Sequence, residues 1–137
     1  MWKVYALLAA LFAALTAIFS KMGVKDVDSN LATAVRVTFI LALTWGIVIF
    51  TGVAGRVKEL SGHTLLFLFL SAVATGLSWL FYFKALQLGE VSRVAPIDKL
   101  SVPLAMILAA LLLHEPLGLK AVAGGLLITL GSLLLLL

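Results

Sequence analysis

The sequence predicts an all-helical membrane protein with five transmembrane helices joined by short loops. Of the 137 residues, 64% are hydrophobic and only 12% are charged, and the mean hydropathy is +1.23. Soluble domains are about 45–50% apolar and about 25% charged, so this composition excludes a soluble globular protein. It also excludes a disordered chain, which needs low hydrophobicity. The apolar stretches do not alternate with polar residues, which excludes a transmembrane β-barrel.

Five apolar stretches each approach the ~20 residues that a helix needs to cross the hydrocarbon core. They comprise residues 4–22, 31–51, 65–88, 95–113 and 119–137. The connections are too short for an extramembrane domain, because independent domains start at about 50 residues. We therefore expect a single five-helix domain over residues 1–137. A cleavable secretion signal is the alternative for the first stretch, but such signals have shorter apolar regions and precede a soluble domain.

The connections contain residues that begin and end helices. The first ends in Asp28, Ser29 and Asn30, which are good N-caps for the second span. The fourth contains Pro116, which prevents the preceding helix from continuing. Connections this short favour antiparallel packing of sequence neighbours.

The basic residues are spread singly along the chain, so we expect no nucleic-acid partner despite the net charge of +4. They are also nearly balanced across the membrane, whereas an excess of Lys and Arg normally fixes orientation. One side holds Lys3, Arg56, Lys58 and Lys120, and the other holds Lys21, Lys25 and Arg93, with Lys84 near that boundary. A chain with so weak a bias can insert either way, and an odd number of spans leaves its termini on opposite sides. Two oppositely inserted copies would form a homodimer of ten helices with inverted repeats; alternatively, other features set the orientation.

Four ionisable residues fall inside the predicted spans, where each costs at least about 2.5–3.5 kcal/mol near the bilayer centre. They are Arg36, Lys84, Asp98 and Lys99. Arg36 either extends its side chain to the interface or contacts a substrate, whereas Lys84 is expected to reach the nearby interface. Three of the four are basic, which favours an anionic or zwitterionic substrate.

Asp98 and Lys99 lie between two prolines, Pro96 and Pro103. If Ala95 caps the fourth helix, Asp98 falls in the first turn, where its carboxylate can accept amide hydrogen bonds. Pro103 cannot donate a hydrogen bond to the Lys99 carbonyl, which loosens the helix. Open backbone at this depth is tolerated only against protein or a water-filled cavity. We expect a cavity around residues 98–103 and a hinge at Pro103.

The third span carries a polar stripe flanked by Trp79. Its members, at spacings of three and four that place them on one helix face, are Ser71, Thr75, Ser78 and Tyr82. Hydrogen bonding between helices and the lining of a substrate cavity are both consistent with this stripe. Small residues on the first and fifth spans, such as Ala13 and Gly125, favour close helix packing, and one of these faces could form a dimer interface.

Residues for catalysis or cofactor binding do not form a recognisable pattern. The chain has no cysteine, and its two histidines, His63 and His114, lie in separate connections. No His, Asp and Glu cluster has metal-ligand spacing, and no glycine-rich phosphate loop is present. We expect neither an enzyme nor a bound metal or cofactor.

The order of several short motifs resembles the EamA-type domain of the drug/metabolite transporter superfamily over essentially the whole chain. These motifs are ATAVR at residues 32–36, FYFKALQLG at 81–89, SRVAPIDKLS at 92–101 and LHEPL at 113–117. Larger members of that family carry two such domains in inverted orientation around a central cavity, so the resemblance implies pairing. Its four-helix relatives exchange protons through a glutamate in the first helix, which this sequence lacks.

Together, these features predict a secondary transporter that exports a small metabolite across the inner membrane, as a dimer and by alternating access. The expected substrate-binding residues are Arg36, Thr75, Ser78, Trp79, Tyr82, Asp98 and Lys99. The alternative is a membrane subunit that does not transport and instead stabilises a larger complex through its small-residue faces.

Overall fold

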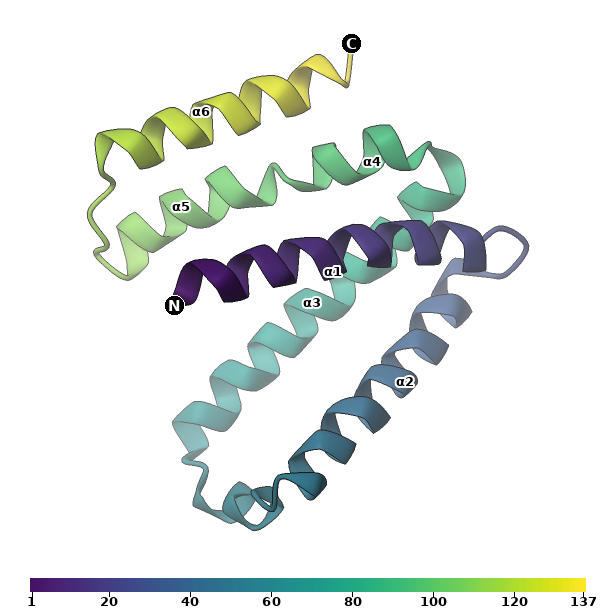
Figure 1. Ribbon diagram of the computed structural model, residues 1–137, viewed down its shortest axis with the longest axis vertical. Helices are drawn as coiled ribbons and strands as arrows, with labels where there is room; N and C mark the ends of the chain where they lie inside the picture. Colours follow the sequence, from purple (N-terminus) through teal and green to yellow (C-terminus); the bar gives the residue numbers. More distant parts are fainter. The chain divides into compact units, whose positions relative to one another are not determined.

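The computed structural model describes all 137 residues and contains helices only (Figure 1). The elements are α1 (Trp2–Gly23), α2 (Ser29–Phe50), the 3-10 helix η1 (Ala54–Glu59), α3 (Gly62–Leu88), α4 (Val91–Asp98), α5 (Ser101–Leu112) and α6 (Leu119–Leu134). Four stretches are long and apolar enough to cross a membrane: α1, α2, α3 and the stretch Val91–Leu112, which comprises α4 and α5; α6 is a shorter apolar helix. The predicted all-α membrane fold is therefore confirmed, whereas the ten-helix pairing stays a prediction.

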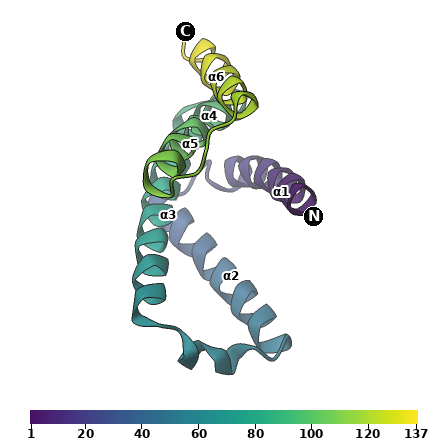
Figure 2. The same ribbon diagram turned by 90° about the vertical axis from the view of Figure 1, so that its left-hand side faces the viewer.

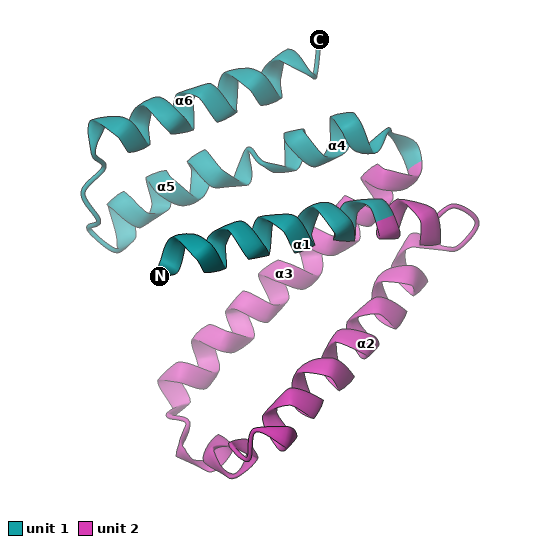
Figure 3. Cartoon of the chain, viewed as in Figure 1, with its two compact units in different colours: residues 1–18, 88–137 teal, residues 19–87 magenta.

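The chain divides into two compact units (Figure 3). One unit comprises residues 1–18 and 88–137, and the other comprises residues 19–87. We describe each unit by itself.

In residues 19–87, α2 and α3 run in roughly opposite directions and diverge toward η1, which connects them (Figure 2). The Asp28 carboxylate caps α2, because its Oδ1 accepts the amides of Asn30 and Leu31, both at 3.0 Å. This confirms the predicted helix start. At its other end, α2 stops before Gly52, which has a φ of 73° that disfavours residues with a Cβ.

The end of α3 is fastened to the connection between α1 and α2. The side-chain amide of Gln87 donates hydrogen bonds to the carbonyl oxygens of Val24 and Val27, and Lys21 Nζ donates to the carbonyl of Leu86. Val24 and Leu86 are fully buried, so these hydrogen bonds lie beside buried apolar side chains. Because these bonds saturate open carbonyls, they hold the start of α2 beside the end of α3.

In the other unit, α6 runs back alongside α5 and α4 (Figure 1). Gly125 of α6 is buried, and a Cβ at this position would lie 3.4 Å from the Sδ and Cε atoms of Met106 and 3.9 Å from Pro103 Cβ. Ser132 is also buried and donates a hydrogen bond of 2.8 Å to the Pro96 carbonyl. The small face of α6 therefore packs against α4 and α5, as its composition predicted.

The fourth span is interrupted at Lys99 and Leu100, between α4 and α5. The amides of Lys99, Leu100 and Val102 bond to carbonyls three residues earlier, at 2.9–3.0 Å, which is a tight 3-10 geometry. Pro103 lies in the first turn of α5, where a missing N–H is tolerated. The helix was expected to loosen at Pro103, one turn after the charged pair, but the break lies three to four residues earlier, at the pair itself. The role of Pro103 as a hinge stays a prediction.

The predicted start of the fourth helix was wrong. The helix begins at Val91 after an extended Glu90, and Pro96 lies inside α4. Asp98 is therefore the last residue of α4 and does not cap its first turn. The apolar pattern begins only at Val94, and this misplaced the boundary because Ser92 and Arg93 are helical although polar.

Candidate binding site at Arg36

Arg36 of α2 lies against the aromatic face of α3. Its Cζ is 4.2 Å from the centroid of the Trp79 ring and 5.6 Å from that of Phe83. Trp79 and Phe83 are four residues apart and so share one face of the helix. Tyr82, on the same helix, interacts electrostatically with Arg36. The structure thus brings together three of the predicted site residues, Arg36, Trp79 and Tyr82.

The guanidinium of Arg36 is only partly satisfied by these contacts. Its Nη1 is buried and has no hydrogen-bond partner. Cation–π contacts contribute about 0.5–2 kcal/mol each, whereas an arginine within a span costs at least about 2.5–3.5 kcal/mol. The remaining donor can form a charge-assisted hydrogen bond with an anionic oxygen. The arrangement is therefore suited to binding a carboxylate or phosphate beside an aromatic surface.

Phe83 was missed among the predicted site residues. It belongs to the motif at residues 81–89, but it lies outside the polar stripe, on the neighbouring face of α3. The spacing of four from Trp79 was the signal that could have found it. Phe83 is buried, with 3% of its surface exposed, so it also packs in the core of its unit.

The two hydroxyl residues of the predicted site, Thr75 and Ser78, are exposed and make no hydrogen bond to Arg36. The Thr75 hydroxyl donates to the Ser71 carbonyl at 2.8 Å, within its own helix. This bond leaves the lone pairs of the oxygen available as acceptors. Their role in substrate binding stays a prediction.

Asp98 and Lys99 form an ion pair of 3.2 Å at the interruption between α4 and α5. Their side chains are 35% and 52% exposed, respectively. Pro103 lies one turn further along. Both charges thus occupy the one place in the fourth span where the helix is open, and each retains polar atoms for a further partner.

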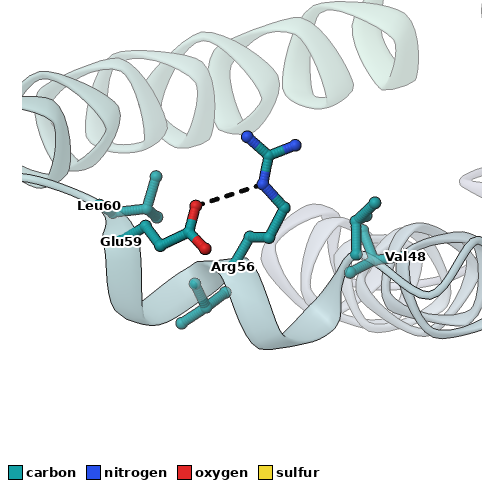
Figure 4. A pocket seen from close by; sticks show the side chains of 6 residues that line it. Val48, Arg56, Glu59 and Leu60 are labelled. Carbon is teal, nitrogen blue, oxygen red and sulfur yellow. Dashed lines mark hydrogen bonds and ion pairs between the residues drawn. The ribbon is translucent and has the colours of Figure 1, made fainter.

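A cavity of about 450 Å³ lies at the connection between α2 and α3 (Figure 4). Arg56 and Glu59 line it together with apolar side chains such as Val48 and Leu60. Arg56 and Glu59 form an ion pair of 3.3 Å. Both charged side chains are more than half exposed, so the pair is worth little. None of the predicted site residues lines this cavity.

Comparisons with known proteins agree with the helical membrane fold. The sequence matches the EamA-like transporter family over residues 1–137. It is 48% identical over 134 residues to a Sinorhizobium protein described as an uncharacterized transporter in the cobO 3′ region, and the match covers 98% of this chain and 95% of the relative. No solved structure matches the chain. The chain belongs to the EamA-like transporter family and is a multi-pass membrane transporter.

Proposed function

We propose that the chain exports a small anionic or zwitterionic metabolite across the inner membrane, as a homodimer that works by alternating access. The observation that supports this most directly is the buried Nη1 of Arg36, held against Trp79 without a hydrogen-bond partner. A donor left open inside a span is unfavourable unless a ligand or a rearrangement satisfies it. A substrate carboxylate or phosphate would supply the acceptor.

The aromatic side chains support the same proposal. The guanidinium lies near the Trp79 and Phe83 rings, so an anion would bind beside an apolar wall. Sites of this kind orient a ligand through a few polar groups and bury the rest of it on hydrophobic ones. We infer that Arg36 fixes the anionic group and that Trp79 contacts the body of the substrate, with Thr75, Ser78 and Tyr82 as further hydrogen-bonding groups.

The interrupted fourth span provides a candidate for the moving part. Transporters commonly place discontinuous helices at the substrate site, and the two halves then rock against each other. Here α4 and α5 are separated at Lys99 and Leu100, and Pro103 keeps the gap from closing into a regular helix. We infer that Pro103 acts as the hinge, and that Asp98 and Lys99 respond to the charge of the substrate.

Pairing is proposed from the odd number of apolar helical segments and the balanced basic residues, which allow opposite insertion of two copies. A tag at the C-terminus, scored for its side in intact cells, tests this part separately. Accessibility from both sides is expected for the antiparallel dimer. Accessibility from one side only would contradict it.

Transport itself is tested with purified protein in liposomes, by solid-supported-membrane currents or uptake, over a panel of anionic, zwitterionic and cationic metabolites. Arg36→Gln is expected to lower the anion signal about tenfold or more, because a hydrogen bond to a charged group is worth about 1.5–3 kcal/mol. Lys120→Gln, at the exposed start of α6, is the matched control. Transport is contradicted if no metabolite moves and if Trp79→Ala and Asp98→Asn leave the cell phenotype unchanged. Those results would favour a subunit that stabilises a larger complex.

A further inference from the structure

A second cavity, of about 350 Å³, lies between the start of α2 and the C-terminal half of α3. Polar residues at one end and apolar residues at the other line it. Its lining includes Asp28, Asn30, Leu77, Leu80, Phe81 and Lys84. None of them belongs to the site around Arg36.

This cavity lies on the side of α3 that faces away from the Arg36 site. At about 100° per residue, the four α3 residues of the lining, Leu77, Leu80, Phe81 and Lys84, fall within about 100° of one another. The centre of this group lies about 130° around the helix from that of Trp79 and Phe83. A ligand here would therefore contact a different face of α3 from the one at Arg36.

The apolar part of the cavity is open to the surroundings. Leu77 is 52% exposed and Phe81 is 76% exposed, although both lie within a helix that is apolar enough to cross the membrane. In a bilayer such side chains contact lipid acyl chains. Lys84 lies on the same face and only four residues before the end of α3, so the charged group marks the interface end of this apolar stripe.

The polar end carries one charge of each sign, and neither is neutralised by the other. Asp28 and Lys84 line the same cavity but form no ion pair. Asp28 uses Oδ1 to cap α2 and retains Oδ2 as an acceptor. A ligand that bridges the two must therefore offer an anionic group to Lys84 and a cationic donor to Asp28.

We propose that this cavity binds a membrane phospholipid whose head group carries a primary amine, as in phosphatidylethanolamine. The phosphate accepts hydrogen bonds from Lys84, the ammonium donates to Asp28 Oδ2, and an acyl chain lies along Leu77 and Phe81. A choline head group has no N–H to donate, and an anionic glycerol head group has no cation for Asp28. The site would thus select the zwitterionic amine lipid.

The experiment is native mass spectrometry of the purified full chain, titrated with phosphatidylethanolamine, phosphatidylcholine or phosphatidylglycerol of identical acyl chains. The wild type is expected to bind phosphatidylethanolamine about fivefold more tightly than phosphatidylcholine. Lys84→Gln should lower that affinity by about fivefold, which corresponds to about 1 kcal/mol for one basic residue at a membrane surface. Lys25 is an exposed lysine in the connection between α1 and α2 and does not line the cavity, so Lys25→Gln should leave the affinity for phosphatidylethanolamine unchanged.

Asp28→Asn provides the sharper test, because asparagine is as good an N-cap as aspartate and only the charge is lost. It should reduce the preference for the amine lipid and raise the affinity for phosphatidylglycerol. The lipid-induced rise in Tm should follow the same order. Three results would overturn the proposal. The wild type could bind the amine and choline lipids equally well, or it could prefer phosphatidylglycerol. Lys84→Gln and Lys25→Gln could also lose the same amount of affinity for phosphatidylethanolamine.

Discussion

The hydroxyl of Ser132 in α6 donates a hydrogen bond of 2.8 Å to the carbonyl oxygen of Pro96 in α4. That carbonyl also accepts the amide of Lys99 at 3.0 Å, in the last turn before the helix is interrupted. The regular helical donor four residues on, the Leu100 amide, bonds to Ile97 instead. A side chain from the last span therefore helps to satisfy backbone that the interruption leaves open.

Ser132→Ala is expected to destabilise the folded chain by about 0.6–2 kcal/mol, because it removes this bond between helices. The free energy of unfolding in mixed micelles is the measurement. Ser71→Ala, at an exposed hydroxyl of α3, serves as the control and should change it by less than about 0.5 kcal/mol. Equal effects of the two substitutions would show that the bond to Pro96 contributes nothing.

Gly125 and Gly124 should respond differently to the same large side chain. A leucine at 125 meets Met106 and Pro103, whereas a Cβ at 124 has no atom within 4 Å. Gly125→Leu is expected to separate α6 from α5 and to lower stability by about 1–3 kcal/mol. Gly124→Leu should be neutral or mildly stabilising, because leucine forms helices better than glycine. The distance between spin labels on α5 and α6 measures this separation. An unchanged distance in Gly125→Leu would contradict the prediction.

The Gln87 side chain should keep the connection between α1 and α2 structurally ordered. Gln87→Leu leaves the carbonyls of Val24 and Val27 without this donor, and Gln87→Glu places a carboxylate against them. We expect hydrogen exchange at residues 24–28 to rise about tenfold in the first variant and further in the second. Lys25→Gln is the control in the same connection. Unchanged protection in Gln87→Leu would show that the Gln87 bonds do not hold the segment.

His114, two residues after the end of α5, has a φ of 54°, in the left-handed region. Glycine adopts this conformation without the cost of about 1–2 kcal/mol that a Cβ brings. His114→Gly is therefore expected to stabilise the chain by about 0.5–1 kcal/mol, whereas Gly52→Ala, at a φ of 73°, should destabilise it. Thermal unfolding compares the two. A lower Tm in His114→Gly would indicate that the side chain makes a contact that outweighs the strain.

Pro103→Ala restores an N–H that can bond to the Lys99 carbonyl, which now accepts Val102 at 2.9 Å. We expect the interruption to shorten and amide hydrogen exchange at residues 99–103 to slow. Transport should also become slower, because the proposed hinge would bend less easily. Pro96→Ala, inside α4, should leave the interruption in place. Faster transport in Pro103→Ala, together with slower exchange, would exclude the hinge while retaining the structural account.

The sequence was sufficient for the helices, because apolar stretches of this length have few other stable forms in a membrane. It was less informative about where polar helix ends lie: α4 begins at Val91 and not at Ala95, so the predicted capping role of Asp98 is wrong. Arg36 and Trp79 were each expected in the site, but their contact depends on the register between α2 and α3. The Gln87 hydrogen bonds that hold the start of α2 beside the end of α3 join residues about sixty positions apart, and no spacing along one helix reveals such contacts.

The interruption at Lys99 and Leu100 has an electrostatic consequence for the fourth span. The negative end of the α4 dipole meets the positive end of the α5 dipole at this point. Lys99 directly follows the negative end of α4, which favours its positive charge. Asp98 is the last residue of α4, where the dipole disfavours a carboxylate, and its ion pair with Lys99 offsets this. The junction is close to neutral at rest while holding both signs within one turn. A single uninterrupted helix would have no negative helix end there to stabilise the charge of Lys99.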